Sequence, residues 1–133
     1  MRKGVVIVDA SLPPGLKANI AAVLSLSLGR KHPEIVGENV KNSDELEMQG
    51  ITQMPLPILQ AAAPDIKRLY LENCMSELYM VIFNDAALVT KSYSDYVKRI
   101  LMQRSEDMVV HGLIAYGGKK LVNKICGSLQ LLR

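Results

Sequence analysis

One short segment near the start of the chain constrains the fold more than any other. Residues 5–8 form a continuously apolar run, Val-Val-Ile-Val, that ends at Asp9. Such a run is typical of a strand that is covered on both faces. A loop with two prolines and a glycine follows, and residues 14–29 then show apolar side chains at helical spacing. A strand, a tight connection and a helix in this order indicate an α/β protein.

The same alternation continues along the chain. We expect further strands at residues 54–61, 78–83 and 108–116, separated by helices, with the last helix after Gly118. Pro55 and Pro57 cannot donate ladder hydrogen bonds, so the second strand either lies at an edge or starts late. Ser92 begins a capping pattern for the third helix. The order predicts a three-layer α/β/α sandwich around a small mixed or mostly parallel four-stranded sheet.

Residues 30–53 show no clear periodicity. They contain Pro33, Gly37 and Gly50, together with a polar run at residues 41–45. A loop of this length without structure is uncommon inside a compact domain. We therefore expect a short hairpin or a functional flap in this segment.

Composition limits the class of protein. The 133 residues are 49% hydrophobic and 22% charged, which suits a single domain over residues 1–133 with a hydrophobic core. The longest uncharged stretch, between Lys17 and Arg30, contains polar residues and is shorter than the about 20 apolar residues of a membrane span. The first residues do not resemble a secretory signal. We expect a cytoplasmic protein with no membrane partner.

The net charge and the two cysteines exclude few further classes of function. The net charge of +3 is spread along the chain and leaves nucleic-acid binding open without indicating it. Cys74 and Cys126 are isolated in the sequence, and we interpret both as small core residues. Nothing in the sequence predicts a metal site or a cofactor.

The first candidate site lies where the first strand meets the first helix. Asp9 and Ser11 follow the strand, and Lys17 and Asn19 lie near the first turn of the helix. Ligands of open α/β sheets bind beyond the carboxyl ends of strands, and free amides at a helix start favour anions. The alternative is that Asp9 satisfies the turn and that Lys17 is solvated. We predict a pocket for a small anionic ligand or a nucleotide.

A second candidate anion site is formed by Gly117, Gly118 and Lys119. Glycines allow a phosphate to approach the backbone, and the lysine adds positive charge. The spacing is not that of a P-loop. We favour the alternative, a strand-to-helix turn with an exposed lysine.

The remaining polar residues have simpler interpretations. His111 lies inside an apolar strand, and we interpret it as a packed, hydrogen-bonded residue because no nucleophile can be assigned to it. His32 is expected to cap the first helix. Asn84 and Asp85 either form a turn or reach the same sheet edge as Asp9, if their strand runs parallel to the first.

Several segments together resemble the type II peptidyl-tRNA hydrolases. The chain is closer still to a group of small uncharacterised proteins assigned to the same fold. Residues 30–53 have no counterpart in the hydrolases. The resemblance rests on an opening strand, a lysine and an alanine pair, and on a closing strand, glycine turn and helix: residues 5–8, Leu12, Lys17, residues 20–22, residues 112–114, Gly117, Gly118, residues 121–124 and residues 129–131. It implies a type II peptidyl-tRNA hydrolase-like fold and a possible homodimer.

The functional residues of the hydrolases match this chain at one position only. Lys17 matches a lysine of the family, whereas Asn19 stands at the position of its second lysine and Ser11 at that of its aspartate. The glutamine and histidine of the family fall on Val23 and Leu26. The resemblance therefore implies the fold without the hydrolase residues, and no residue can be named as catalytic.

The sequence thus favours a protein that binds an anionic ligand over a protein that catalyses a reaction. Two alternatives remain open. One is an altered or residual peptidyl-tRNA hydrolase-like esterase, and the other is a protein-interaction scaffold that uses the segment at residues 30–53.

Overall fold

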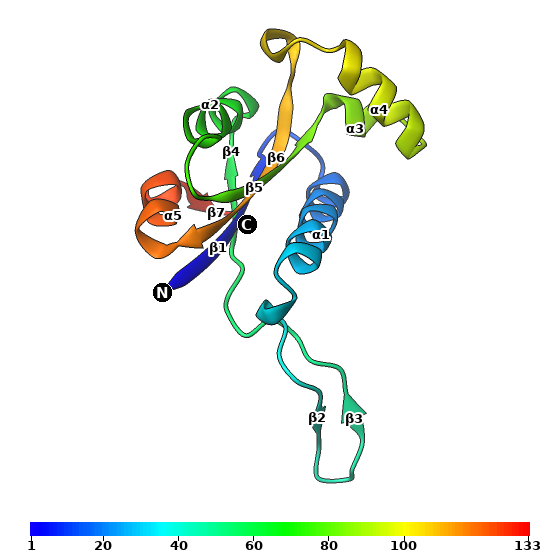
Figure 1. The fold of residues 1–133 in the computed structure, drawn as a ribbon, viewed down its shortest axis with the longest axis vertical. Helices are drawn as coiled ribbons and strands as arrows, with labels where there is room; N and C mark the ends of the chain where they lie inside the picture. Colours follow the sequence, from blue (N-terminus) through cyan, green and yellow to red (C-terminus); the bar gives the residue numbers. More distant parts are fainter.

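A mixed five-stranded sheet forms the centre of the computed structural model, which describes all of residues 1–133 (Figure 1). Its order is β5-β6-β1-β4-β7. Only β1 and β4 are parallel, and the other three neighbouring pairs are antiparallel. The strands are β1 (Arg2–Asp9), β4 (Ile58–Ala61), β5 (Tyr79–Asn84), β6 (Val110–Gly118) and β7 (Gln130–Leu131).

The prediction of a mixed sheet is confirmed, but a mostly parallel sheet and a count of four strands are both wrong. The chain leaves β5 through two helices that stay at the end of the sheet, so it returns directly alongside as the antiparallel β6. The fifth strand, β7, is a two-residue segment that pairs with β4 near the end of the chain. Two residues are too few to show a strand periodicity in the sequence.

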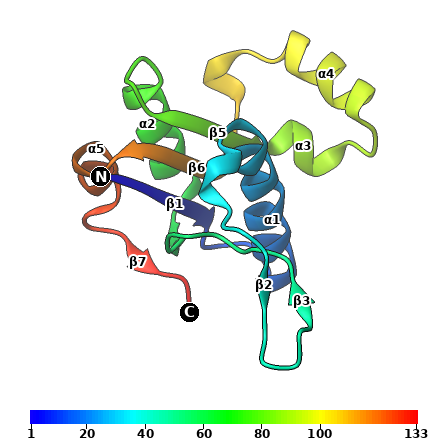
Figure 2. The same cartoon turned by 60° about the horizontal axis from the view of Figure 1, so that its bottom comes forward.

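Helices cover both faces of this sheet, which confirms the three layers (Figure 2). Helix α1 (Pro14–Lys31) packs on the face that carries Val6 and Val8 of β1. Helices α2 (Ala63–Asn73) and α5 (Lys119–Cys126) pack on the opposite face, which carries Val5 and Ile7. The alternation of side chains along β1 therefore divides the core into two halves.

The ends of α1 and α4 follow local sequence signals. His32 is the C-cap of α1, as expected, and its backbone N–H donates to the Leu28 carbonyl at 2.8 Å. Ser92 caps α4 (Tyr93–Met102), because its hydroxyl accepts from the Asp95 N–H at 3.2 Å. Helix α3 (Asp85–Val89) precedes α4, and a 3₁₀ turn (Ser105–Asp107) follows it.

The segment at residues 30–53 forms the expected hairpin. A 3₁₀ turn (Pro33–Ile35) leads into β2 (Val40–Lys41) and β3 (Glu47–Met48), which pair with each other and with no other strand. The hairpin projects from the body of the molecule (Figure 1). It supplies no residue to either half of the core except Ile35 at its base.

The structure also tests the expectations for the proline-containing strand and for the two cysteines. Strand β4 begins at Ile58, directly after Pro57, and lies between β1 and β7, so the prolines delay the strand and do not mark an edge. Cys126 is buried as expected, but Cys74 is exposed, because it follows the last turn of α2 on the surface. None of the helices combines the length and apolar character needed to cross a membrane.

The contact between α1 and β6 requires a glycine at position 112. A Cβ atom there would lie 2.3 Å from Cγ2 of Ile20, a fully buried side chain. We predict that Gly112→Ala lowers the free energy of unfolding by about 1–3 kcal/mol, measured by chemical denaturation. Gly29→Ala is the matched control. A Cβ at Gly29 meets no atom within 4 Å and Gly29 lies in α1, so this variant should be more stable by about 0.4–1 kcal/mol. Equal stability of the two variants would contradict this packing.

Candidate functional site

An irregularity in β6 places a histidine at the carboxyl end of β1. Phe83 of β5 pairs with Gly112, but the next residue, Asn84, pairs with Val110. His111 is therefore the extra residue of a bulge in β6. Bulges commonly redirect a side chain beside a functional site. Here the side chain of His111 reaches Asp9, the last residue of β1.

Asp9 is held by three hydrogen bonds. Its Oδ2 atom lies 2.8 Å from Nδ1 of His111. Its Oδ1 atom accepts from the backbone N–H of Ser11 at 2.9 Å and from the Ser11 hydroxyl at 2.7 Å. The Asp9 side chain is 4% exposed and that of His111 is 14% exposed. A charged group with so little access to water needs such partners.

These contacts keep the carboxyl group ionised. Burial raises the pKa of Asp9, but the hydrogen bonds from His111 and Ser11 outweigh burial, and the pKa lies below its ordinary value of 3.8. An ionised carboxylate can only accept, so Nδ1 of His111 carries the proton in this contact. Nε2 is then the nitrogen with a free lone pair when the ring is neutral.

Nε2 of His111 is not fully buried. Every fully buried side-chain nitrogen and oxygen in the structure has a hydrogen-bond partner. Nε2 has none, so it reaches the surface. Asp9 and Ser11 also line an open cavity of about 490 Å³ between the end of β1 and the start of α2. Asp9 therefore adjoins this cavity directly, whereas His111 is not among its lining residues.

Asn84 and Asp85 lie at the same edge of the sheet. Both β1 and β5 are antiparallel to β6, so they run in the same direction and end together. Asn84 caps α3, since its Oδ1 accepts from the Ala87 N–H at 3.2 Å. Asp85 accepts from Gln103 Nε2 at 2.8 and 2.9 Å and from the Val109 N–H at 3.2 Å.

The contacts of Asp85 explain its ionisation. Burial raises its pKa, but the hydrogen bonds from Gln103 and from backbone N–H groups outweigh burial, so the pKa is lowered. Both of its oxygens are used to hold the chain that leads from α4 into β6. Asn84 and Asp85 thus support the bulge, and Asp9 with His111 remains as the candidate site.

The other predicted ligand residues lie elsewhere. Lys17 and Asn19 belong to α1, which covers the face of the sheet opposite to α2. Their side chains form no hydrogen bond or ion pair, and they do not line the cavity beside Asp9. The structure brings Asp9 and Ser11 together and leaves Lys17 and Asn19 without contact to them.

Gly117 and Gly118 are the last two residues of β6, and Lys119 is the first of α5. A Cβ at Gly117 would lie 2.7 Å from Cδ2 of Leu78, so packing accounts for this glycine without a ligand. The backbone N–H of Lys119 donates to the Met1 carbonyl at 3.0 Å. These contacts fit the strand-to-helix turn that the sequence favours.

His111 is the site residue that the sequence alone did not identify. Its hydrogen bond confirms the expected packing, but its partner is the carboxylate that ends β1. The only signal in the sequence is a histidine beside Gly112 in an apolar strand, together with an aspartate at the end of another. No three metal-ligating side chains come together in the structure.

A family model described as "Protein of unknown function (DUF2000)" matches residues 2–133. The chain belongs to this family. Among solved structures, the chain is similar to the protein of unknown function Atu0240 from Agrobacterium tumefaciens strain C58. The two chains are 16% identical, with a TM-score of 0.90 over 99% of this chain and 98% of that one. This similarity shows the fold alone. Among the curated proteins, none matches the chain.

The lowered pKa of Asp9 leads to a prediction about acid stability. The ionised carboxylate stabilises the fold above its ordinary pKa of 3.8, and this contribution is lost as the pH falls through the lower pKa of the folded state. Asp9→Asn should therefore reduce the loss of stability on acidification, measured as the free energy of unfolding from about pH 6 to about pH 2. Asp44→Asn, at an exposed turn, is the control. An unchanged slope for Asp9→Asn would show that these hydrogen bonds do not lower the pKa.

Proposed function

We propose that this DUF2000 protein is a hydrolase that cleaves an ester bond with water activated by the Asp9–His111 pair. The observation that supports this proposal is the 2.8 Å contact between Asp9 and Nδ1 of His111, combined with an Nε2 atom that has no protein partner and is not fully buried. A buried carboxylate that fixes the tautomer of a histidine is the arrangement that orients the general base in Ser-His-Asp hydrolases.

The proton transfers follow from this geometry. Nε2 of His111 accepts a proton from a water molecule while the water oxygen forms a bond to the ester carbonyl carbon. Asp9 stabilises the imidazolium that results. When the carbon–oxygen bond to the leaving group breaks, the imidazolium returns the proton to the departing alkoxide. Ser11 is not the nucleophile in this scheme, because its hydroxyl donates to Asp9 at 2.7 Å and not to His111.

The charge at this edge favours hydrolysis over simple anion binding there. The ionised carboxylate of Asp9 repels a ligand anion in the adjoining cavity, and no lysine or arginine lines that cavity. A neutral ester carbonyl does not meet this repulsion. A neutral ester can therefore bind beside Asp9 more readily than an anionic ligand can.

The substrate class follows from the sequence resemblance. We propose that the mixed sheet is a variant of the type II peptidyl-tRNA hydrolase fold and that the substrate is an ester of an acylated amino acid with a hydroxyl group. The mixed α/β architecture is compatible with this relationship. Asp9 and His111 would then take over the role of the hydrolase residues whose positions are occupied here by Ser11, Asn19, Val23 and Leu26.

We expect His111→Gln and Asp9→Asn to lower kcat/KM for ester hydrolysis by about 10²–10⁴-fold. The measurement is release of tRNA from acetyl-aminoacyl-tRNA, together with turnover of a panel of simple esters. The control is His32→Gln, which changes the other histidine. No turnover of any ester by the wild type, or full activity of His111→Gln, would overturn the proposal.

A second candidate is a pocket for a small anionic ligand or nucleotide at the start of α1. Its first turn has no acidic residue, and its N-cap, Pro13, offers no side-chain hydrogen bond to the free amides. Lys17 has no carboxylate partner, so its ammonium group is available. An anion could satisfy both.

This candidate predicts a thermal shift. A ligand from a panel of nucleotides and organic anions should raise the Tm of the wild type, and Lys17→Ala should abolish the rise because it removes the only cation of the first helical turn. Lys31→Ala, at the far end of α1, is the matched control. A shift that survives Lys17→Ala would place the ligand elsewhere.

A further inference from the structure

The edge of the sheet at β5 is not covered by another strand. Strand β5 pairs with β6 on one side only. Residues 4–9 of the central strand β1 are all buried, whereas residues 79–82 of β5 are half-buried. The half-buried side chains alternate between the two faces, since Met80 and Ile82 pack with one half of the core and Tyr79 and Val81 with the other. The sheet therefore ends at an apolar strand with free backbone groups.

This edge lacks the usual protection against pairing. Exposed edges normally carry a charge, a proline or a covering element. Residues 79–83, Tyr-Met-Val-Ile-Phe, contain neither a charge nor a proline. An extended segment is the partner that such an edge accepts, because main-chain hydrogen bonds extend the sheet.

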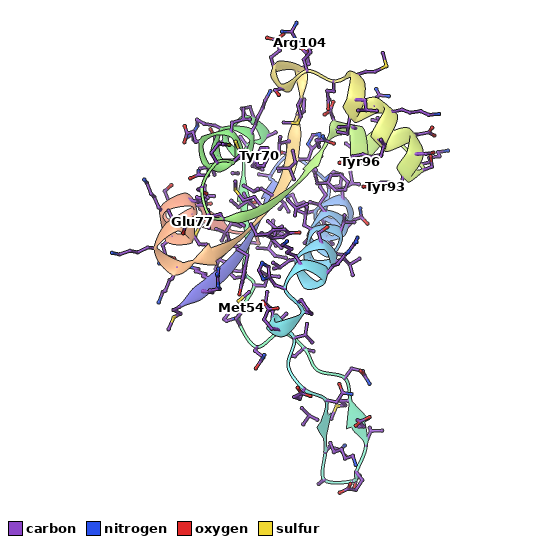
Figure 3. The ribbon with its side chains drawn as sticks, viewed as in Figure 1. Met54, Tyr70, Glu77, Tyr93, Tyr96 and Arg104 are labelled. Atoms are coloured by element: carbon purple, nitrogen blue, oxygen red, sulfur yellow. The ribbon has the colours of Figure 1, made fainter.

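A groove of about 370 Å³ runs along the same edge. It is lined by Val81 and Ile82, neighbours that point to opposite faces of the sheet, so it follows the rim of β5 itself. Its walls are α1 on one side and the start of α4 on the other, where Tyr93 and Tyr96 lie toward α1 (Figure 3). No residue of α4 is buried, so this wall keeps apolar surface free.

The projecting hairpin provides a segment of the right shape. We call residues 36–53 the arm. Asn42 fixes its tip by accepting from the N–H groups of Asp44 and Leu46, and Gly37 and Ile51 close its base. A two-stranded hairpin by itself is marginally stable in water. The arm nevertheless exposes large apolar side chains, with Leu46 62% and Ile51 81% exposed.

The charges of arm and groove are complementary. The arm carries one lysine and four acidic residues, which are Glu38, Asp44, Glu45 and Glu47. Of these four, only Glu45 has an ion-pair partner. Lys91 is the one cation that lines the groove itself, and it has no ion-pair partner. Two cavities that adjoin the groove carry further unpaired cations. Arg30 and Lys31 line the cavity that shares Ser27 with the groove, and Lys98 and Arg99 line the one that shares Thr90 and Lys91 with it.

We propose that two copies of the chain exchange arms, so that the arm of each copy lies along the β5 edge of the other. A strand of the arm extends the sheet through main-chain hydrogen bonds. The apolar side chains of the arm enter the groove, and its carboxylates face Lys91 and the cations of the adjoining cavities. The exchange is reciprocal and closes with two-fold symmetry. It does not depend on the proposed hydrolytic activity.

The test uses charge reversal on each side of the contact. The arm variant is Glu38→Lys with Glu47→Lys, and the groove variant is Arg30→Glu with Lys91→Glu. Wild type should be a dimer by sedimentation equilibrium, and each variant alone should be a monomer, because like charges then meet in both contacts. An equimolar mixture of the two variants should be a dimer again, since opposite charges meet in both contacts.

The control is Asp65→Lys with Glu72→Lys on α2, away from the groove. It makes the same change of charge as the arm variant and should stay dimeric. Far-ultraviolet circular dichroism checks that each variant is folded. A monomeric wild type at submillimolar concentration would overturn the proposal. So would dimeric single variants, or a mixture that remains monomeric.

Discussion

The buried carboxylate of Asp9 is the interaction on which the candidate site depends. Removing a charge from water is costly, and here three hydrogen bonds from Ser11 and His111 offset that cost. Two of them come from the turn that follows β1, and the third comes from a neighbouring strand more than a hundred residues later. The end of β1, the turn and the bulge in β6 must therefore form together.

The architecture around this carboxylate serves to bring β6 beside β1. Because α3 and α4 stay at the end of the sheet, β6 returns antiparallel between β5 and β1. The bulge then needs support on both sides. Gly112 allows α1 to pack closely against the strand, and Asp85 holds the backbone of Val109 just before it. The position of the Asp9–His111 pair thus depends on packing from one face and on hydrogen bonds at the edge.

The sequence alone predicted the layers, the helices and the hairpin, because these follow from local periodicity, caps and turn residues. Ser92 and His32 were assigned as caps from sequence, and the structure places them so. Sheet order and the bulge were not predictable, because they depend on which distant strands pair. For the same reason the sequence grouped Lys17 with Asp9 along the chain, whereas the structure pairs Asp9 with His111. The exposed edge of β5 was also invisible until the strand order was known.

Asp9 fixes the imidazole of His111 with the proton on Nδ1 and leaves Nε2 without a protein partner. Nitrogen-15 NMR of the histidine side chains at about pH 8, where an ordinary histidine is neutral, tests it directly. We predict that His111 is in the Nδ1–H tautomer in the wild type and that this preference is lost in Asp9→Asn. An Nε2–H tautomer of His111, or a preference that the substitution leaves unchanged, would contradict the account.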